Sequence, residues 1–577
     1  MKTLTEKHSF ISETKFRFKS LLFSIKRQIQ NTFSPIHRFK DEGKLKNKRV
    51  ISFSESALWN PNDNEQNWIL TAGKIENLRI AIQRINRIEI PANKTFSFWK
   101  HIGNPNIGKG YVIGREIREG CIVPTVAGGL CQLSNALYDA ALKANFEIIE
   151  RHQHTRVIKG SLAEQGRDAT VKWNYVDLRF KSAQPFRIEI DITSDQLIVK
   201  FKSAETDPVS DDSPINTVPS SKLNDCYSCG NFSCYKHPDR SSVKQENAIT
   251  TFILDDKWNE YDDYIKSISS AKDFFLLPLK KNKLVKTNRY NWTVNSAKNT
   301  KSVPFTAFER AIKLRFSNSK NNAFSLMLRY DKKVAEALLK HIPVESSHIV
   351  ISQNLLPYAW ESGIFGGRTF DVLMSRLPME KLHETLDLAH QKYPESKTLN
   401  DFRAPQEIMD LESMALTKSR NIITPHQGIA DVFNNKVIRL SWLFPKKQEK
   451  KIAMGNKILF PASALGRKGA YEMKRLAIEL NLSLVVSGKS KESENFWEGL
   501  TIEKAGENPF ENIGLIIYPA YVEHQPRLLL KAISAGIPVI TTAAAGLAPR
   551  ENLTILPVGD YDALKKEVVL QLRKLSA

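Results

Sequence analysis

Short apolar runs separated by helix-length segments dominate the second half of the chain. From about residue 247 onward these runs read TTFILDD, DFFLLPL, HIVISQ, NIITPH, KILFPAS, LSLVVSG, LIIYPAY and PVITT. Buried parallel strands are continuously apolar, and helices connect them on both faces of the sheet. The pattern therefore predicts two doubly wound, Rossmann-like α/β domains, over residues 246–445 and 446–577.

The first half follows a different pattern. Residues 51–203 contain one long amphipathic helix, LTAGKIENLRIAIQRI, among several short strands, which is typical of a compact α+β domain. A stretch rich in Pro, Ser and acidic residues follows from Ser203 to Lys222 and predicts a linker. We expect a basic arm over residues 1–50, the α+β domain over 51–203, and a linker with a Cys/His cluster over 204–245.

Composition excludes several classes of protein. Hydrophobic residues make up 41% of the 577 residues, which is ample for packed cores. No apolar run approaches the roughly 18 residues of a spanning helix, and the N-terminal residues lack a signal-peptide pattern. Five cysteines, three of them bunched, do not make a disulfide framework. We expect a cytoplasmic protein, peripheral on the inner face of the cytoplasmic membrane if it contacts the membrane at all.

Positive charge changes this picture. The formal net charge is +22, which favours anionic partners. Residues 1–50 carry 13 Lys/Arg against four Asp/Glu, and FRFKSLLFSIKRQIQNTF within them predicts a basic amphipathic helix. Such a helix rests on anionic membrane; the alternatives are a solvated arm or a helix packed on the next domain. No nucleic-acid-binding motif is present, so nucleic acid is not an expected partner.

Candidate chemistry in the last domain follows two of the predicted strands. KILFPASALGRKGAYEMKRLAIEL gives a strand, a loop of small residues and a helix that opens at Gly469. Backbone N–H groups and the positive end of a helix attract phosphate there, and Arg467 and Lys468 add two cations for a diphosphate. YPAYVEHQPRLLLKAISAGIPVITT gives a strand, a turn with Glu523 and His524, a helix and another strand.

This text resembles the nucleotide-sugar-binding domain of GT-B glycosyltransferases of the family-4 retaining type. The resemblance implies that Lys468 binds the donor diphosphate and that Glu523 grips the donor sugar. Two positions depart from the family. Lys531 stands where the family has a ribose-binding glutamate. Ser463 stands where the family has an arginine, and we expect Arg467, on the neighbouring turn, to reach the same phosphate in its place. The predicted donor-binding set is Ser463, Arg467, Lys468, Gly469, His524 and Lys531. The alternative is a doubly wound scaffold without catalysis.

Residues 246–445 then supply the acceptor side. His426, in the segment TPHQG, is predicted to be a general base or an acceptor-site hydrogen-bond donor, against the alternative of a structural histidine. The segment NLLPYAWESGIFGGRTFDVL, residues 354–373, is aromatic and glycine-rich and predicts a binding loop.

A second family resemblance covers the α+β domain. GGLCQLSNALY, RHQHT, DATV and DLRF resemble the VanW-like domain, named after an accessory protein of vancomycin-resistance clusters. Cys131 opens a helix there, His152 and His154 follow in an expected strand, and Asp168 begins the next one. Cys, His and Asp in this order are typical of papain-like and transglutaminase-like thiol enzymes. The alternative is a buried structural cysteine.

The linker carries a third candidate site. DCYSCGNFSCYKHPD places Cys226, Cys229, Cys234 and His237 within twelve residues. Three thiolates and an imidazole suit a tetrahedral structural zinc ion, with an iron–sulfur cluster or free thiols as the alternatives.

Two functions fit these features. The first is a retaining glycosyltransferase that moves sugar from a nucleotide-sugar donor to a glycan or lipid-linked acceptor of the cell envelope or a surface polysaccharide. Its VanW-like domain would then be accessory. The second is a thiol hydrolase or acyltransferase centred on Cys131, with the α/β half as a non-catalytic sugar-binding module.

Overall fold

The computed structural model describes most of the chain. The described residues are 18–19, 21–29, 36–60, 65–118, 121–154, 161–204, 224–225, 249–280, 289–293, 299–316, 323–401, 403–445 and 455–576. They form two compact units, one of residues 1–249 with 343–347 and 363–369, the other of the remaining residues up to 577. The four predicted zinc ligands lie outside the described residues, so that prediction stays a prediction.

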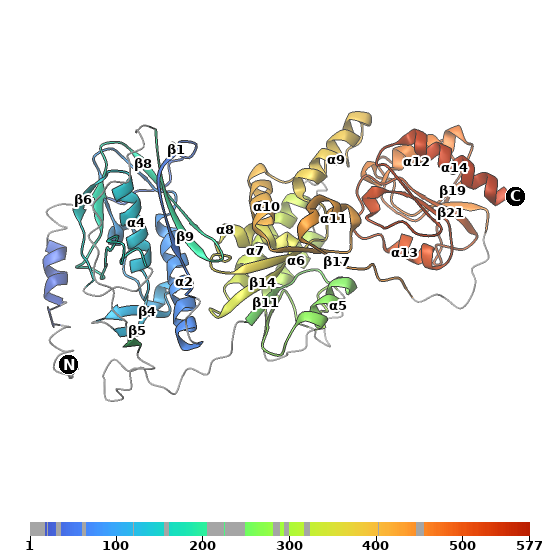
Figure 1. Cartoon of the computed structure of the whole chain (residues 1–577). Coiled ribbons are helices and arrows are strands. Elements are labelled where there is room, and N and C mark those ends of the chain that lie inside the picture. The colour runs from blue at the N-terminus through green and yellow to red at the C-terminus, as the bar shows by residue number, and fades with distance from the viewer. Residues whose placement is uncertain are drawn as a thin grey trace. The chain divides into compact units, whose positions relative to one another are not determined.

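The first unit is an α+β domain, as the sequence predicts (Figure 1). Its main sheet is antiparallel. The strand order is β1 (Arg49–Ala57), β9 (Gln196–Ser203), β8 (Phe186–Ile192) and β2 (Glu89–Ile90). Helix α4 (Cys131–Lys143) packs on strands β1 and β9 of this sheet. Apolar residues of helix α2 (Glu65–Ile85) belong to the same hydrophobic core. Buried phenylalanines such as Phe146, Phe180 and Phe201 fill the space between them.

Two smaller sheets complete the first unit. Strands β3 (Thr95–Ser97), β7 (Arg179–Lys181) and β6 (Glu147–Glu150) pair antiparallel in this order. The chain that leaves the end of β6 carries the predicted histidines, His152 and His154. Strands β4 (Ile113–Arg118) and β5 (Cys121–Val126) form a hairpin that leads through two glycines into α4. The cysteine at the start of α4 therefore follows this hairpin after a short glycine-containing turn.

The second unit begins with a seven-stranded sheet. Its strands are ordered β13 (Thr300–Ser302), β12 (Phe274–Leu277), β11 (Ile249–Ile253), β14 (Ser346–Ser352), β15 (Thr369–Leu373), β16 (Asn421–Thr424) and β17 (Val437–Arg439). The helices around it are α5 (Asn259–Ile268), α6 (Pro304–Arg315), α7 (Ala323–Leu339), α8 (Leu356–Glu361), α9 (Met379–Lys392), α10 (Gln406–Lys418) and α11 (Gln427–Phe433). A sheet order that runs outward from β11 in both directions defines a doubly wound domain.

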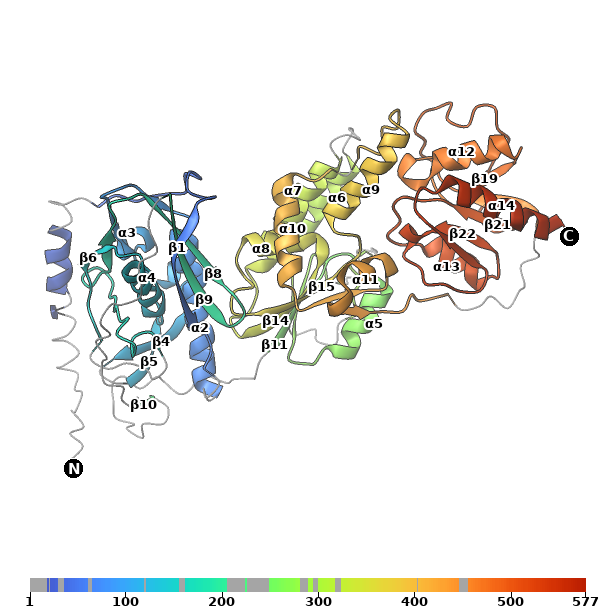
Figure 2. The ribbon, with the colours of Figure 1, turned by 45° about the horizontal axis from the view of Figure 1, so that its top comes forward.

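The last domain has six parallel strands with helices on both faces (Figure 2). Their order is β20 (Ile502–Lys504), β19 (Leu484–Val486), β18 (Lys457–Phe460), β21 (Ile513–Tyr518), β22 (Val539–Thr542) and β23 (Leu553–Leu556). Helices α12 (Ala470–Glu479), α13 (Arg527–Ser534) and α14 (Tyr561–Ser576) flank the sheet. In chain order this is 3-2-1-4-5-6, the order of the Rossmann fold. The two predicted Rossmann-like domains are thus confirmed.

One predicted loop is wrong. Residues 354–373, expected to be a glycine-rich binding loop, contain helix α8 and strand β15, and Leu356, Tyr358 and Val372 are buried. Their aromatic and aliphatic side chains belong to the core, and the glycines lie only in the turn between helix and strand. Among the helices that the structure describes, none has both the length and the apolar composition to cross a bilayer.

Candidate functional site

Two of the predicted site residues, Lys468 and Glu523, lie at the topological switch point of the last sheet. Strands β18 and β21 are neighbours there, and the strand order reverses between them. Lys468 belongs to the loop that follows β18, and Glu523 to the loop that follows β21. In doubly wound sheets, ligands bind in the crevice outside the carboxyl ends of the strands at this point. The fold therefore brings together two residues 55 positions apart in the chain.

Lys468 and Glu523 form an ion pair. The Nζ atom of Lys468 lies 2.9 Å from Oε2 of Glu523 and donates to the Val522 carbonyl oxygen at 3.0 Å. The Tyr518 hydroxyl also donates to Oε2, and the backbone N–H of Gln525 donates to Oε1 at 2.9 Å. Burial raises the pKa of Glu523, but the charge of Lys468 and these hydrogen bonds outweigh it, so the pKa lies below its usual value. Glu523 is therefore a carboxylate, able to accept further hydrogen bonds.

Two glycines permit the close approach of these loops. Gly469 has a φ of +78°, and a Cβ there would lie 2.1 Å from the Pro519 carbonyl oxygen. A Cβ on Gly488, after β19, would lie 2.1 Å from Cα of Ser463. Larger residues would push the loops after β18, β19 and β21 apart. The glycines that follow Lys468 and Ser487 in the sequence thus have a direct structural reason.

The other predicted donor-binding residues are less tightly grouped. The guanidinium of Arg467 lies 3.4 Å from the carboxylate of Asp401, a residue of the preceding Rossmann-like domain. The buried Nε2 atom of His524 has no partner among the described residues, and burial lowers the His524 pKa to about 3, which keeps the ring neutral. Lys531 lies exposed on α13, and none of the described interactions connects it with the Lys468–Glu523 pair.

His426 is placed differently from the prediction. It is 1% exposed at the start of α11, and its Nε2 atom lies 3.1 Å from the Glu523 carbonyl oxygen and 3.2 Å from that of Ala544. Its Nδ1 atom accepts the N–H of Ile429. Burial lowers the His426 pKa, which favours the neutral ring. The two carbonyl acceptors place its proton on Nε2, and the Ile429 N–H requires the lone pair on Nδ1. Both nitrogens are engaged within the protein, which favours a positioning role over the predicted proton transfer.

Sequence reasoning missed two residues of this site. Tyr518 was counted only as the end of a strand, although its hydroxyl bonds Glu523. Glu492, on the segment after β19, accepts the Gly466 N–H and the Thr398 hydroxyl. Their sequence signal is weak: Tyr518 is the last residue of an apolar strand, and Glu492 lies six residues after the end of another.

The first unit holds a separate cluster around Cys131, the first residue of α4. Its Sγ atom lies 3.7 Å from the Thr170 hydroxyl oxygen and 3.8 Å from the Val171 carbonyl oxygen, and the residue is partly exposed. Burial raises the Cys131 pKa, but the side-chain hydrogen bonding and charge of His154, with smaller contributions from Val171 and Thr170, outweigh burial and lower the pKa overall. Thiolate is the form stabilised here.

Asp168 orients the histidine. Its Oδ1 atom lies 2.6 Å from Nδ1 of His154, and its other oxygen accepts the backbone N–H of the same residue. Asp168 is fully buried, and Arg151 donates to its carbonyl oxygen at 2.7 Å. Burial lowers the His154 pKa, but Asp168 and Cys131 outweigh it and raise the pKa to about 10. The structure thus brings together three of the four residues that the sequence placed in this candidate site.

His152 does not join the cluster. It is 48% exposed, and its Nε2 atom lies 3.3 Å from Glu150. The expected strands are also wrong, since β6 ends at Glu150 and both His154 and Asp168 lie in extended loop segments. The loops hold their positions through side-chain hydrogen bonds instead of a strand ladder.

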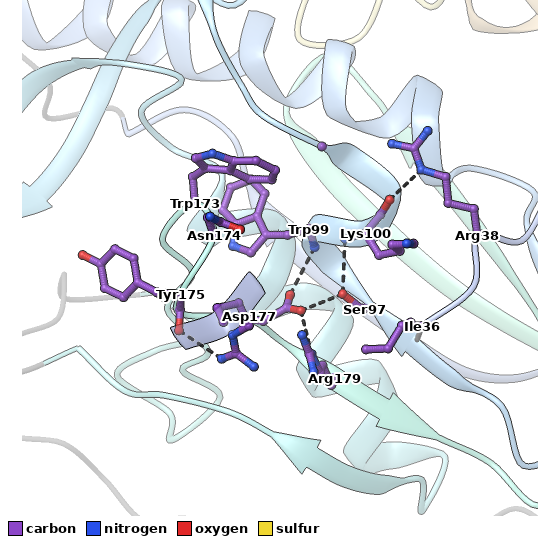
Figure 3. Close-up of a pocket in the computed structure, with 12 residues that line it drawn as sticks. Ile36, Arg38, Ser97, Trp99, Lys100, Trp173, Asn174, Tyr175, Asp177 and Arg179 are labelled. Carbon is purple, nitrogen blue, oxygen red and sulfur yellow. Dashed lines mark hydrogen bonds and ion pairs between the residues drawn. The ribbon is translucent and has the colours of Figure 1, made fainter. Parts of the chain in front are cut away.

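A cavity of about 320 Å³ lies elsewhere in the first unit (Figure 3). Asp177 is at its centre and accepts hydrogen bonds from Ser97, Arg179 and the backbone N–H of Trp99. Trp99, Trp173 and Tyr175 supply aromatic walls, and Arg27, Ile36 and Arg38 come from the N-terminal arm. Part of the basic arm therefore packs on the α+β domain, which was one of the alternatives considered for it.

No group of three or more His, Cys, Asp or Glu side chains with the geometry of a metal site occurs in the described ranges. The described part of the chain thus consists of an α+β domain with a Cys–His–Asp cluster and two Rossmann-like domains with a Lys–Glu pair at a switch point.

The α+β domain is similar to VanW-like proteins. Residues 73–202 match the family model described as "VanW like protein", as the sequence motifs predicted. An uncharacterized protein of Bacillus subtilis, YoaR, is 32% identical over 131 residues, which cover 22% of this chain and 43% of that protein. The vancomycin B-type resistance protein VanW of Enterococcus faecalis is 29% identical over 147 residues, 25% of this chain and 52% of that protein. The chain thus spans about half the length of these relatives.

Solved glycosyltransferase structures match the C-terminal part. The lipopolysaccharide outer core galactosyltransferase WaaB is 12% identical with a TM-score of 0.33, covering 57% of this chain and 91% of that one. WaaG, a glycosyltransferase involved in lipopolysaccharide biosynthesis, is 15% identical with a TM-score of 0.32, covering 56% and 90%. A sucrose-phosphate synthase from Thermosynechococcus elongatus is 13% identical with a TM-score of 0.33, covering 57% and 90%.

Proposed function

We propose that the second unit is a retaining glycosyltransferase that uses a nucleotide-sugar donor. The observation that carries the proposal is the Lys468–Glu523 pair at the carboxyl ends of β18 and β21. A cation and a carboxylate at a Rossmann switch point suit a ligand with a diphosphate at one end and hydroxyl groups at the other. The sequence resemblance assigns the same two residues to these two parts of the donor.

The chemistry follows from the donors and acceptors in the pair. The Lys468 ammonium has three N–H donors, and the Val522 carbonyl and Glu523 use two of them. The third is available to a phosphate oxygen and would stabilise the charge on the departing nucleoside diphosphate. Glu523 would accept hydroxyl protons of the donor sugar and hold its ring. His426 would keep this loop in place through the Glu523 carbonyl oxygen.

The acceptor in this proposal is a glycan or lipid-linked intermediate of the cell envelope or a surface polysaccharide. The net charge of +22 suits an anionic donor and an anionic membrane surface. The protein would then work in the cytoplasm or at the inner face of the cytoplasmic membrane, with the VanW-like domain as an accessory domain.

Release of nucleoside diphosphate from a panel of nucleotide sugars tests the proposal. Lys468→Ala should weaken binding of the free nucleoside diphosphate about ten- to a hundredfold, since a charge-assisted hydrogen bond is worth about 1.5–3 kcal/mol. Glu523→Gln should leave that affinity intact and lower turnover. Product anomers determined by NMR test retention of configuration.

Lys457→Ala is the matched control. Lys457 lies at the amino end of the same strand, β18, and pairs with Glu503 at 2.6 Å, on the opposite edge of the sheet. It should bind and turn over donor as the unchanged protein does. If Lys468→Ala and Lys457→Ala behave alike, the assignment of the cleft is wrong and the second unit is a scaffold.

A further inference from the structure

The Cys131 cluster has the parts of a thiol active site, and the proposed glycosyl transfer uses none of them. Helix α4 begins at Cys131, and its Sγ atom lies 3.7 Å from the hydroxyl of Thr170, two residues after Asp168. The Thr170 N–H donates to the His152 carbonyl oxygen at 2.8 Å, which brings the His154 loop to the same place, and His154 is the charge partner of the thiol. The Nδ1 atom of His154 is 2.6 Å from a fully buried carboxylate, Asp168. In thiol enzymes these three groups are the nucleophile, the general acid–base and the residue that orients it.

We propose that Cys131, His154 and Asp168 form a second active site that cleaves or transfers acyl groups, with an amide or ester carbonyl as substrate. The cluster lies wholly within the first unit and is independent of the donor site. Cys131 is partly exposed, and its Sγ atom lies beside the Thr170 hydroxyl. A merely structural cysteine requires neither the histidine nor the carboxylate behind it.

The reaction follows from the positions of the protons. The Cys131 thiolate attacks the carbonyl carbon, and the π electron pair moves to the oxygen. As this oxyanion collapses, the C–N or C–O bond breaks, and the Nε2 proton of His154 goes to the departing amine or alcohol. The acyl group is then held as a thioester. Water, or an acceptor amine, attacks the thioester and gives its proton to His154, and the thiolate leaves as the acid or the new amide is released.

The surroundings of the sulfur favour its charged form. The Thr170 hydroxyl is placed to donate to a thiolate, and the positive end of α4 lies at Cys131. Neighbouring elements carry charges of both signs. Arg151 donates to the Asp168 carbonyl oxygen, and the stem of Lys74 of α2 lies against Gly129. Lys172, next to Val171, pairs with Glu116 at 2.9 Å, and Asp139 of α4 pairs with Arg167 and Lys143.

Alkylation by iodoacetamide, with peptide mapping to separate Cys131 from the other four cysteines, tests the state of the sulfur. Cys131 should react well below the ordinary thiol pKa of about 8.5, and at pH 6 at least about tenfold faster than the same protein carrying His154→Gln. His152→Ala, which removes the neighbouring histidine outside the cluster, should change nothing. Circular dichroism confirms folding of each variant.

An ester substrate tests the chemistry. With p-nitrophenyl acetate the unchanged protein should release a burst of nitrophenolate equal to the enzyme concentration and carry one acetyl group on Cys131, whereas Cys131→Ala should show neither. Asp168→Asn should slow acylation while the sulfur stays in place. The proposal is overturned if Cys131 of the unchanged protein alkylates only above pH 8, a measurement that needs no variant, or if acetylation is the same in His154→Gln.

Discussion

His101 shows what one buried side chain does at the scale of a residue. It is 4% exposed, its Nδ1 atom lies 2.8 Å from the Ser97 carbonyl oxygen, and its Nε2 atom accepts the backbone N–H of Phe39 at 3.1 Å. The rings of Phe39 and Phe96 each stack on the imidazole. Only the neutral ring with its proton on Nδ1 satisfies both hydrogen bonds, since a proton on Nε2 would face another N–H group.

Acid should therefore destabilise the first unit. Burial is the main cause that lowers the His101 pKa from 6.5 to about 4. Between these pH values the unfolded chain binds more protons than the folded one, so stability falls as the pH falls, by up to about 3 kcal/mol for this residue. Urea unfolding at pH 7 and pH 4.5 measures the loss, which should be smaller in His101→Gln. An equal loss in both proteins would show that other groups cause it.

The choice between His152 and His154 marks where sequence reasoning ends at this scale. The residue types and their order indicated a thiol site, and the structure does bring Cys131, His154 and Asp168 together. Side chains two positions apart point the same way in a regular strand, so the sequence alone treated both histidines as candidates. The chain leaves β6 at Glu150, and the loop that follows separates them, with Asp168 binding both the ring and the backbone N–H of His154. Such a contact depends on the tertiary position of the loop.

Helix α11 illustrates the same point at the scale of an element. Its first turn is capped by His426, whose partners Glu523 and Ala544 lie 97 and 118 residues further along the chain. The strand before it was predicted from its apolar run, whereas the carbonyl oxygens that bond Nε2 of His426 come from another domain. No local pattern indicates these two partners. They engage the nitrogen that proton transfer would need, which favours a positioning role for His426.

Gly546 makes this contact possible. It has a φ of +62°, and a Cβ there would lie 2.2 Å from the His426 ring. Gly546→Ala should destabilise the second unit by about 1–2 kcal/mol through its backbone and by about 1–3 kcal/mol more through the clash. Gly536→Ala, where φ is +82° and no atom lies within 4 Å of the added Cβ, should show only the first cost. Urea midpoints of the two variants give the difference, and equal midpoints would contradict the role of His426.

The N-terminal helix is a second element whose side chains are only partly used by the fold. Residues 18–19 and 21–29 are helical, and Arg27 pairs with Glu150 at 2.8 Å while the ring of Phe23 stacks on Tyr175 at 6.0 Å. Large apolar side chains of the helix are nevertheless exposed by 46–62%: Phe18, Leu21, Leu22, Phe23, Ile25 and Ile29. An apolar face beside Lys19 and Lys26 suits the surface of an anionic membrane.

Vesicle sedimentation checks this interpretation. The protein should bind vesicles that contain anionic lipid, and salt should weaken binding. Replacing Leu21 and Leu22 together by Asp should lower binding at least about tenfold per residue, because a buried leucine contributes about 1.5–3 kcal/mol. Leu388→Asp, at a leucine 63% exposed on α9, is the control and should bind normally. Equal binding by both variants would leave the helix as a packing element only.

At the scale of the whole molecule, the two units have separate cores. One hydrophobic cluster extends from Leu58 to Phe201, and the largest one from Phe252 to Val568 spans both Rossmann-like domains. The latter two also share polar contacts, such as Arg527 with Glu260 and the Trp442 indole N–H with the Gly546 carbonyl oxygen. The apolar runs predicted the sheets and the separation of the halves. They did not predict the shared core, which depends on side chains from distant segments.

Calorimetry should resolve these units. Because their cores are separate, we expect at least two unfolding transitions, one for each unit. A nucleoside diphosphate such as UDP binds only the folded donor site, so it should raise the midpoint of one transition and leave the other unchanged. A ligand at a hundred times its Kd adds about 2.7 kcal/mol to the unit that binds it. His101→Gln identifies the transition of the first unit and Gly546→Ala that of the second. If only the midpoint of the first unit rises, the nucleotide binds outside the Rossmann-like domains. A single transition would show that the two cores unfold together.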